Sequence, residues 1–189
     1  MRITGGQARG IPLALPKGDA VRPATDALRQ AVFSSLAARV PGTQFLDLFA
    51  GSGAYGLEAL SRGAAGGVFV ERDARTAAFI RQNLAAVSKS LGRDTGGVQV
   101  ITADATSVAL TAAPDLVFID PPYEIIREVG PKLFARLTEM LKGRADPLIV
   151  FEMPGEIELA PPDWTCVKRL GKGGRQPTAC IFRSSRAAP

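Results

Sequence analysis

The chain has 189 residues, of which 46% are hydrophobic, and this length and composition fit one globular domain with a complete core. It contains no apolar run long enough to span a membrane, and it contains no histidine, which excludes catalytic triads and zinc sites that need an imidazole. The formal net charge of +5 comes from the two ends of the chain, because residues 1–29 hold five basic and two acidic side chains and residues 166–189 hold six basic side chains and no acidic one.

The amino-terminal segment is predicted to form a short basic arm. Two strand-like pieces flank Gly5-Gly6, which indicates a β-hairpin that carries Arg2 and Arg9. We assign residues 1–21 to this arm and residues 22–189 to the main domain. Residues 1–6 contain no apolar signal core, so we expect a cytoplasmic protein. Helical spacing of apolar residues then predicts a helix over residues 27–38, with Thr25 or Asp26 as its cap.

From residue 45 onward, apolar strands alternate with helices. Nearly continuous apolar strands in this arrangement are typical of a parallel sheet covered on both faces, so we predict an α/β protein with a three-layer, Rossmann-like architecture. The predicted strands are residues 45–49, 67–71, 98–101, 116–119 and 148–152, and the predicted helices are residues 55–61, 74–87 and 126–141.

The end of the chain is predicted to form an antiparallel hairpin of residues 164–170 and 178–183. Its tip, residues 171–175, is basic. Cys166 and Cys180 lie in this hairpin without the spacing of metal ligands, so we expect two reduced thiols and no metal site.

A glycine-rich loop follows the first predicted strand. Residues 51–56, Gly-Ser-Gly-Ala-Tyr-Gly, match G-x-G-x-x-G between a strand and a helix, where glycines let the backbone approach a cofactor and the helix pack on the strand. Glu71 ends the next strand, where a carboxylate can accept hydrogen bonds from ribose hydroxyls. Asp47, four residues before Gly51, would attract an ammonium group and repel a pyrophosphate. These features favour S-adenosylmethionine, which carries an ammonium group and no phosphate.

Asp104 follows the third predicted strand and has two possible roles that do not exclude each other. It can accept a hydrogen bond from the adenine edge, or it can cap a helix that starts at Ala105. The predicted cofactor-binding residues are Asp47, Phe49, Ala50, Gly51, Ser52, Gly53, Glu71, Arg72, Asp104 and Ala105.

The fourth predicted strand ends at Asp120-Pro121-Pro122-Tyr123, because Pro121 has no N–H to donate to a strand ladder. One interpretation is a proline turn that only ends the strand. The other is an amine clamp, in which Asp120 and the Pro121 carbonyl accept the two N–H groups of a planar amine while Tyr123 stacks on its ring. The position of the motif at the same sheet edge as the glycine loop favours the clamp. Asp120, Pro121, Pro122 and Tyr123 are therefore the predicted catalytic residues.

These motifs resemble a known family. The segment Leu46-Asp47-Leu48-Phe49-Ala50-Gly51-Ser52-Gly53, together with Glu71, Asp104 and the amine clamp, is similar to the class I methyltransferases that modify exocyclic amino groups. The segments Arg2-Ile3-Thr4-Gly5-Gly6, Arg9-Gly10, Arg22-Pro23-Ala24-Thr25-Asp26, Arg29 and Leu57-Glu58-Ala59-Leu60-Ser61-Arg62-Gly63-Ala64 resemble the bacterial RsmD-type methyltransferases of 16S ribosomal RNA.

The resemblance implies a seven-stranded sheet whose last strand is antiparallel, with S-adenosylmethionine as cofactor. It also implies that the substrate is the N2 amine of one guanine in small-subunit ribosomal RNA, on the assembled or assembling 30S particle. A single domain of this size can dock on such a particle as a monomer. One departure from the family pattern is the segment of residues 171–178, which is longer and more basic than a short turn.

The basic ends of the chain predict a polyanionic partner, although a solvated tail and loop would have the same composition. With the resemblance, this partner is 16S RNA in the small ribosomal subunit. The predicted RNA-binding residues are Arg2, Arg9, Arg22, Thr25, Arg29, Lys172 and Arg175.

Other functions use some of the same motifs. An adenine-N6 methyltransferase would use the same clamp on another planar amine, and a glutamine methyltransferase usually has asparagine where Asp120 stands. A nicotinamide-dependent oxidoreductase would use the glycine loop, but Asp47 disfavours its pyrophosphate. A noncatalytic RNA-binding protein would have no need for both the clamp and the cofactor loop.

Overall fold

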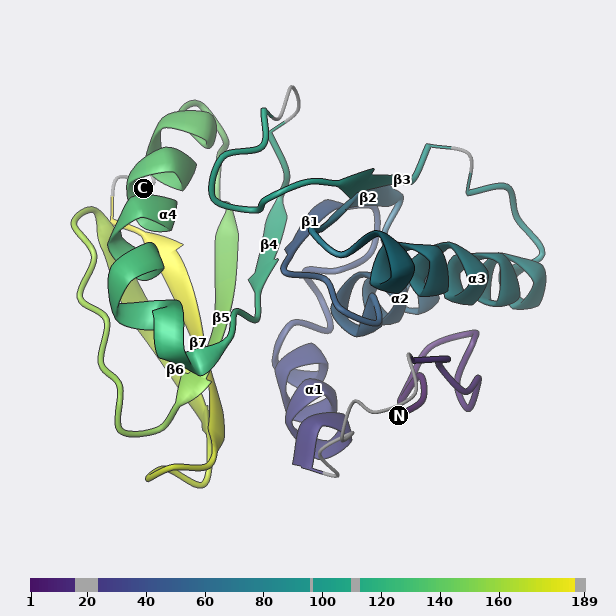
Figure 1. Cartoon of the computed structure of the whole chain (residues 1–189), viewed down its shortest axis with the longest axis horizontal. Helices are drawn as coiled ribbons and strands as arrows, with labels where there is room; N and C mark the ends of the chain where they lie inside the picture. The colour runs from purple at the N-terminus through teal and green to yellow at the C-terminus, as the bar shows by residue number, and fades with distance from the viewer. Residues whose placement is uncertain (16–23, 96, 110–112, 186–189) are drawn as a thin grey trace.

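The computed structural model describes residues 1–15, 24–95, 97–109 and 113–185. Seven strands of this part of the chain form one sheet (Figure 1). The strands are β1 (Gln44–Leu48), β2 (Gly66–Glu71), β3 (Gln99–Thr102), β4 (Leu116–Ile119), β5 (Leu148–Pro154), β6 (Trp164–Gly171) and β7 (Pro177–Ser184). The helices are α1 (Ala24–Ser35), α2 (Ala54–Ser61), α3 (Ala74–Leu91), α4 (Ile126–Met140) and the 3-10 turn η1 (Tyr123–Ile125).

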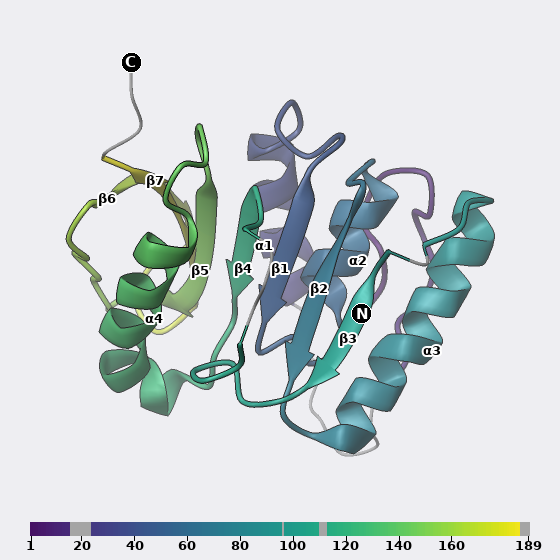
Figure 2. The ribbon, with the colours of Figure 1, turned by 90° about the horizontal axis from the view of Figure 1, so that it is seen from above.

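The strand order is β3-β2-β1-β4-β5-β7-β6. Neighbouring strands from β3 to β5 are parallel, whereas β7 is antiparallel to both β5 and β6. This arrangement confirms the predicted α/β class and the mostly parallel sheet of seven strands with an antiparallel final strand. Strands β2 and β3 are added on one side of β1, and β4 and β5 are added on its other side, so the strand order reverses between β1 and β4. The parallel strands all end at the same edge of the sheet (Figure 2). Ligands of open α/β sheets bind outside this edge, at the point of reversal.

Side chains alternate between the two faces of the sheet, and each face has its own core. Phe118 of β4 packs on the side of α1, α2 and α3, whereas its neighbours Val117 and Ile119 pack on the side of α4. The three-layer prediction therefore holds, because helices bury both faces. Among the helices of the described residues, none combines the length and the apolar composition that a membrane span needs.

The ends of two helices differ from the predicted ranges by more than one residue. Helix α1 runs from Ala24 to Ser35 instead of over residues 27–38. Helix α3 continues to Leu91, where Gly92 adopts a left-handed conformation with φ 60° and ends it. Apolar spacing locates a helix, but its terminal turns depend on capping contacts, so the bounds are harder to predict than the element.

The amino-terminal arm shares its core with the main domain. Its two short pieces pair through an isolated antiparallel bridge between Arg2 and Pro12, as the predicted hairpin requires. The predicted boundary between residues 21 and 22 lies outside the described residues. The core that contains α1 and α2 also includes the buried arm residues Ile3, Ala8 and Leu13.

Hydrogen bonds fix the arm on α2 and α3. The backbone N–H and the hydroxyl of Thr4 each donate to Glu58 of α2 at 2.8 Å. The Asn83 side chain of α3 accepts from the Ala14 N–H at 2.8 Å and donates to the carbonyls of Ala14 and Ser52 at 3.0 Å each. One buried amide thus joins the arm to the loop that follows β1.

Candidate active site

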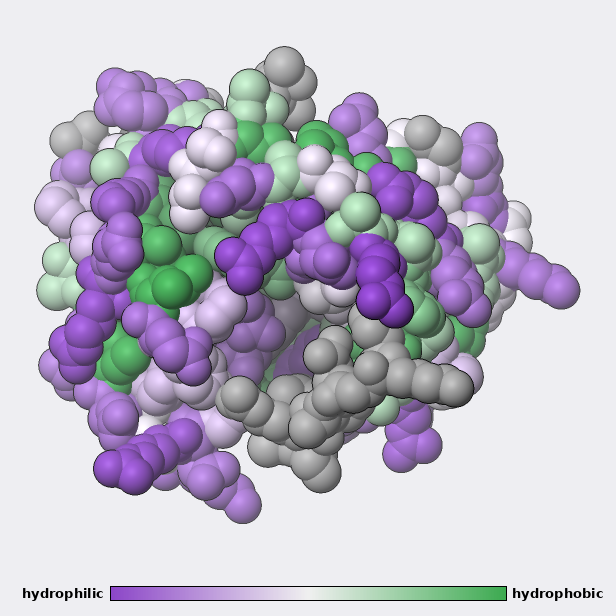
Figure 3. Space-filling model, viewed as in Figure 1, coloured by the Kyte–Doolittle hydropathy of each residue, from purple (hydrophilic) through white to green (hydrophobic). Residues whose placement is uncertain are grey.

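A cavity of about 760 Å³ opens at the carboxyl ends of the parallel strands. Small-molecule sites typically have volumes of about 300–1,000 Å³. In the space-filling view this face is hollowed near its centre, and hydrophilic residues line the recess (Figure 3). The lining joins segments that are far apart in the sequence, namely residues 49–52, 71–73, 104–106 and 120–125, together with Asp47, Tyr55 and Glu152.

The loop after β1 turns sharply to reach α2. Gly51 and Gly53 have positive φ angles of 53° and 77°, which glycine adopts without strain. A Cβ on Gly53 would lie 3.2 Å from the Phe69 ring, and a Cβ on Gly56 would lie 2.4 Å from the same ring. Gly53 and Gly56 therefore let α2 pack closely on the sheet. Gly51 lines the cavity, whereas Gly53 is not part of its lining, and the expected cofactor contact of Gly53 stays a prediction.

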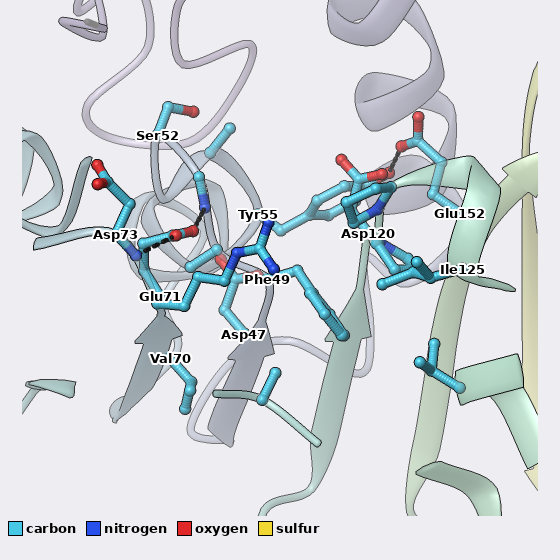
Figure 4. Close-up of a pocket in the computed structure, with 18 of the residues that line it drawn as sticks. Asp47, Phe49, Ser52, Tyr55, Val70, Glu71, Asp73, Asp120, Ile125 and Glu152 are labelled. Atoms are coloured by element: carbon cyan, nitrogen blue, oxygen red, sulfur yellow. Dashed lines mark hydrogen bonds between the residues drawn. The ribbon is translucent and has the colours of Figure 1, made fainter. Parts of the chain in front are cut away.

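Glu71 holds the glycine loop at the end of β2. Its Oε2 accepts from the Gly51 N–H and its Oε1 accepts from the Asp73 N–H, both at 2.9 Å (Figure 4). A carboxylate offers about four lone-pair positions, so these two donors leave capacity for ribose hydroxyls. The residue lies in the cavity wall, as its predicted role requires.

Asp47 is buried beneath the same loop. Its Oδ2 accepts from the Gly56 N–H at 2.9 Å, and only 2% of its surface is exposed. Burial raises the pKa of Asp47 to about 8; the Glu71 charge acts in the same direction, whereas the Gly56 hydrogen bond and the Arg29 charge oppose the rise. A nearby cation favours the ionised form of a carboxyl group. Whether Asp47 carries a proton would therefore depend on what occupies the cavity.

Asp104 caps a turn and also lines the cavity. Its Oδ1 accepts from the N–H and the hydroxyl of Thr106 at 2.7 and 2.6 Å, and these bonds lower the pKa of the Asp104 carboxyl. Asp104 therefore acts as a cap, as predicted, but the segment that it caps is a turn and not a helix. The contact to adenine stays a prediction.

The four residues of the amine clamp all line the cavity. The Asp120 N–H makes a long contact of 3.4 Å with the Leu48 carbonyl of β1, and the ladder of β4 then ends at Pro121. Pro122, with φ −53° and ψ 134°, leads into η1, which begins at Tyr123. Asp120 is exposed, and Figure 4 shows its side chain across the cavity from Glu71.

Among the lining residues that were not predicted, Tyr55 and Glu152 form a hydrogen-bonded pair. Tyr55 of α2 donates its hydroxyl to Glu152 Oε2 at 2.8 Å, and both side chains are buried in the cavity wall beside Asp120 (Figure 4). A signal for Glu152 is present in the sequence, because it is a lone carboxylate that follows the apolar run Leu148 to Phe151. Tyr55 occupies a variable position of the glycine motif and carries no comparable signal.

Arg29 is not available to a phosphate at the surface. Its side chain is 2% exposed, and its guanidinium lies 3.4 Å from Glu58 Oε2 and 2.8 Å from Asp26 Oδ1. Glu58 is fully buried, so the guanidinium of Arg29 balances a charge inside the protein. The prediction that Arg29 binds RNA phosphates is therefore wrong.

The basic tip between β6 and β7 lies at the same sheet edge as the cavity. Strand β7 runs antiparallel to β5 with Pro177 opposite Pro154, which puts the preceding tip beside the end of β5. The Gly155 N–H donates to the Gln176 carbonyl at 3.0 Å. The tip exposes Lys172 and Arg175.

The other predicted RNA-binding residues are distributed around the arm and α1. Arg2 and Arg9 are exposed on the arm, and Met1 of the arm lines the cavity. Arg22 lies outside the described residues. Thr25 lies in the first turn of α1, and its side chain also lies outside the described part.

The residues of the cavity fit S-adenosylmethionine. Acceptor carboxylates are present for ribose hydroxyls, a buried carboxyl is present for an ammonium group, and Val70, Ala105 and Ile125 supply apolar surface. A pyrophosphate would lie among three acidic residues of the lining, Asp47, Glu71 and Asp120. Within the ranges that the structure describes, no three acidic or cysteine side chains are grouped to hold a metal ion.

Proteins of similar sequence come from several bacteria. Ribosomal RNA small subunit methyltransferase D of Escherichia coli (strain K12) is 42% identical over 125 residues, which cover 65% of this chain and 60% of that protein. The chain therefore matches less than two thirds of the length of this relative. The Bacillus subtilis protein YlbH is 35% identical over 169 residues, which cover 84% of this chain and 85% of that protein.

Solved structures share the fold over nearly the whole chain. The structure of yhhF from Escherichia coli has a TM-score of 0.80 at 30% identity, and HI0767 from Haemophilus influenzae has a TM-score of 0.74 at 26% identity; both alignments cover 97% of each chain. The model of one protein family matches residues 1–179. The chain therefore belongs to the family described as "Conserved hypothetical protein 95", the family of RsmD-type proteins that its motifs resemble.

Proposed function

We propose that this protein transfers a methyl group from S-adenosylmethionine to the exocyclic N2 of one guanine in 16S ribosomal RNA, on the assembled or assembling small subunit. The Escherichia coli relative is named a methyltransferase of small-subunit ribosomal RNA, and this chain belongs to the same family. The proposal includes action as a monomer in the cytoplasm.

One observation carries the proposal. A single cavity contains both a glycine loop held by Glu71 and an exposed Asp120 followed by Pro121-Pro122-Tyr123. The first half suits a nucleoside cofactor with a cationic amine, and the second suits a planar amine with two N–H donors. Their common wall would bring methyl donor and acceptor within reach of each other.

The chain's own residues would orient both molecules. When bound, S-adenosylmethionine supplies an electrophilic methyl group. Glu71 would accept from the ribose hydroxyls, and the Asp47 carboxylate would attract the amino group. Asp120 and the Pro121 carbonyl would accept the two N–H groups of guanine N2, which holds the nitrogen lone pair in line with the methyl group and stabilises the charge that develops on nitrogen. The proton lost by N2 would pass to Asp120 and then to solvent.

The target base must leave its stack to reach this cavity, at a cost of a few kcal/mol. Stacking on Tyr123 would offset about 1–3 kcal/mol of that cost without selecting a base. Arg2 and Arg9 of the arm and Lys172 and Arg175 of the tip would hold the flanking phosphates, since all four are exposed.

The decisive assay is transfer of a tritiated methyl group to small subunits that lack the modification, followed by nucleoside analysis. The proposal expects N2-methylguanosine in the 16S RNA. N6-methyladenosine would instead identify an adenine methyltransferase, and tight binding of NADH without binding of S-adenosylhomocysteine would identify an oxidoreductase.

Substitution of Asp120 tests its role in the chemical step. We expect Asp120→Ala to lower the methyl-transfer rate at least about 100-fold, because both the orientation of N2 and the stabilisation of its charge are lost. Calorimetric titration with S-adenosylhomocysteine should give the wild-type affinity, since Asp120 is not needed to hold the cofactor. A variant with full transfer activity would contradict the clamp.

A further inference from the structure

Glu152 lies beside Asp120 because of the sheet register. Strands β4 and β5 are parallel, and the last pair of their register is Ile119 opposite Phe151, so Asp120 and Glu152 each directly follow a residue of this pair. Neighbouring strands are about 4.8 Å apart, so two carboxylates stand at adjacent positions on the edge of the cavity.

Both carboxylates belong to the same face of the sheet. Ile119 and Phe151 point to the α4 side, so alternation turns the next side chain of each strand to the α2 side. Tyr55 of α2 is on that side, where its ring stacks on Phe118 at 5.3 Å and its hydroxyl donates to Glu152 Oε2 at 2.8 Å. Figure 4 shows Asp120, Tyr55 and Glu152 gathered in one part of the cavity.

Tyr55 anchors the Glu152 carboxylate. The pKa of Tyr55 is raised well above its ordinary value by burial and by the charges of Glu152 and Asp120, so the phenol remains a hydrogen-bond donor. A carboxylate offers about four lone-pair positions, and the phenol occupies one of them. The aromatic stack and this bond together restrict where the carboxylate can lie.

Two adjacent acceptors match the donor pattern of guanine. The Watson–Crick edge of guanine carries donors at both N1 and N2, whereas adenine and cytosine each place an acceptor nitrogen next to their amino group. A flipped base is read by hydrogen bonds to this edge. A buried carboxylate that meets an acceptor nitrogen would lose its hydrogen bond and face a lone pair instead.

We propose that Glu152 selects guanine by accepting its N1–H, while Asp120 accepts from its N2 amine. This inference deepens the proposed function and rests on it. Glu152 would be a specificity-determining residue, whereas Asp120 and Pro121 would orient the reacting nitrogen for any planar amine.

The test compares guanine with 2-aminopurine at the target position. 2-Aminopurine keeps the exocyclic amine at C2 but has an acceptor at N1. Once the modified guanine has been mapped in the wild-type product, 16S RNA is ligated with either base at that position and assembled into subunits. The guanine preference of each variant is the initial methyl-transfer rate on guanine divided by the rate on 2-aminopurine.

Glu152→Gln keeps the shape of the side chain and an oxygen that can accept from Tyr55, and its amide can donate to the acceptor N1 of 2-aminopurine. We expect the rate on guanine to fall at least about 10-fold and the guanine preference to shrink at least about 10-fold. Glu139→Gln on α4 makes the same chemical change at an exposed site outside the cavity and should keep both wild-type values.

A purely structural role for Glu152 gives a different result. In that case the rates on both bases fall by the same factor and the preference stays unchanged, which overturns the inference, as does full wild-type activity of Glu152→Gln. Binding of S-adenosylhomocysteine by the variant shows that it is folded. If the wild-type protein methylates no guanine, the proposed function fails; if it does and only the preference test fails, the inference alone is wrong.

Discussion

At the scale of single residues, Asp47 couples its protonation to the content of the cavity. Its pKa of about 8 means that the carboxyl carries a proton at pH 7 when no cation lies beside it. An ammonium group bound beside Asp47, as we propose for the cofactor, would favour the ionised form, so binding would expel this proton. The affinity for S-adenosylhomocysteine should therefore rise as the pH rises from 6 towards 8, and the rise should level off above the pKa of Asp47.

The proton release can be measured directly. Calorimetry at pH 7 in two buffers of different ionisation enthalpy should show that the wild-type protein releases most of one proton per ligand. Asp47→Asn has no carboxyl to ionise, so it should release none and bind about 10-fold more weakly. Equal release by both proteins would mean that the proton comes from another group.

At the scale of elements, the arm and α1 are joined to α2 through Glu58. This carboxylate is fully buried and accepts from Thr4 of the arm, from Arg62 of its own helix at 2.8 Å and from Arg29 of α1 at 3.4 Å. Removal of one partner of a buried ion pair leaves the other charge uncompensated. The packing of three segments therefore depends on one charge.

We expect Glu58→Gln to lower the free energy of unfolding by about 3 kcal/mol, the lower end of the range for a broken buried pair. Denaturant titration measures this loss. Glu139→Gln, which removes an exposed pair with Lys142 that has side-chain exposures of 70% and 60%, should change the free energy by less than about 0.5 kcal/mol. Similar losses in the two variants would show that the Glu58 network adds no stability.

At the scale of the whole molecule, the exposed basic residues of the arm and of the tip belong to segments that meet the cavity edge. Met1 of the arm lines the cavity, and the tip adjoins the end of β5. RNA that reaches the cavity would therefore cross both segments. Each phosphate contact contributes to the salt dependence of binding.

The logarithm of the RNA affinity falls linearly with the logarithm of the salt concentration, and each phosphate contact adds to the slope of this line. We expect the double variant Lys172→Ala/Arg175→Ala to bind 16S RNA with a slope that is smaller by roughly 1.5–2, because two phosphate contacts are lost. Affinities measured by filter binding between about 50 and 200 mM salt give this slope. Lys89→Ala/Lys142→Ala removes the same charge near the carboxyl ends of α3 and α4, at the opposite edge of the sheet, and should keep the wild-type slope. Equal slopes for the two double variants would exclude the tip as an RNA contact.

The sequence by itself determined the order of the elements and the location of the motifs. Apolar periodicity, glycine turns and a proline at a strand end are local signals, so the parallel strands, the glycine loop and the end of β4 at Asp120 could be predicted. The cavity lining contains all four clamp residues and every predicted cofactor-binding residue except Gly53. Parallel strands bring their carboxyl ends to one edge, which is why local patterns were sufficient here.

Only the tertiary structure decided which charges are buried and what they face. Arg29 lies in a basic segment, which predicts a phosphate contact at the surface, yet Glu58 of another helix holds its guanidinium inside the protein. In the sequence, Glu152 is only the last residue of a predicted strand. In the structure, the neighbouring strand β4 and the hydrogen bond from Tyr55 bring it beside Asp120. A charge is stable in the interior only where a distant segment supplies its partner, and no local pattern records that partner.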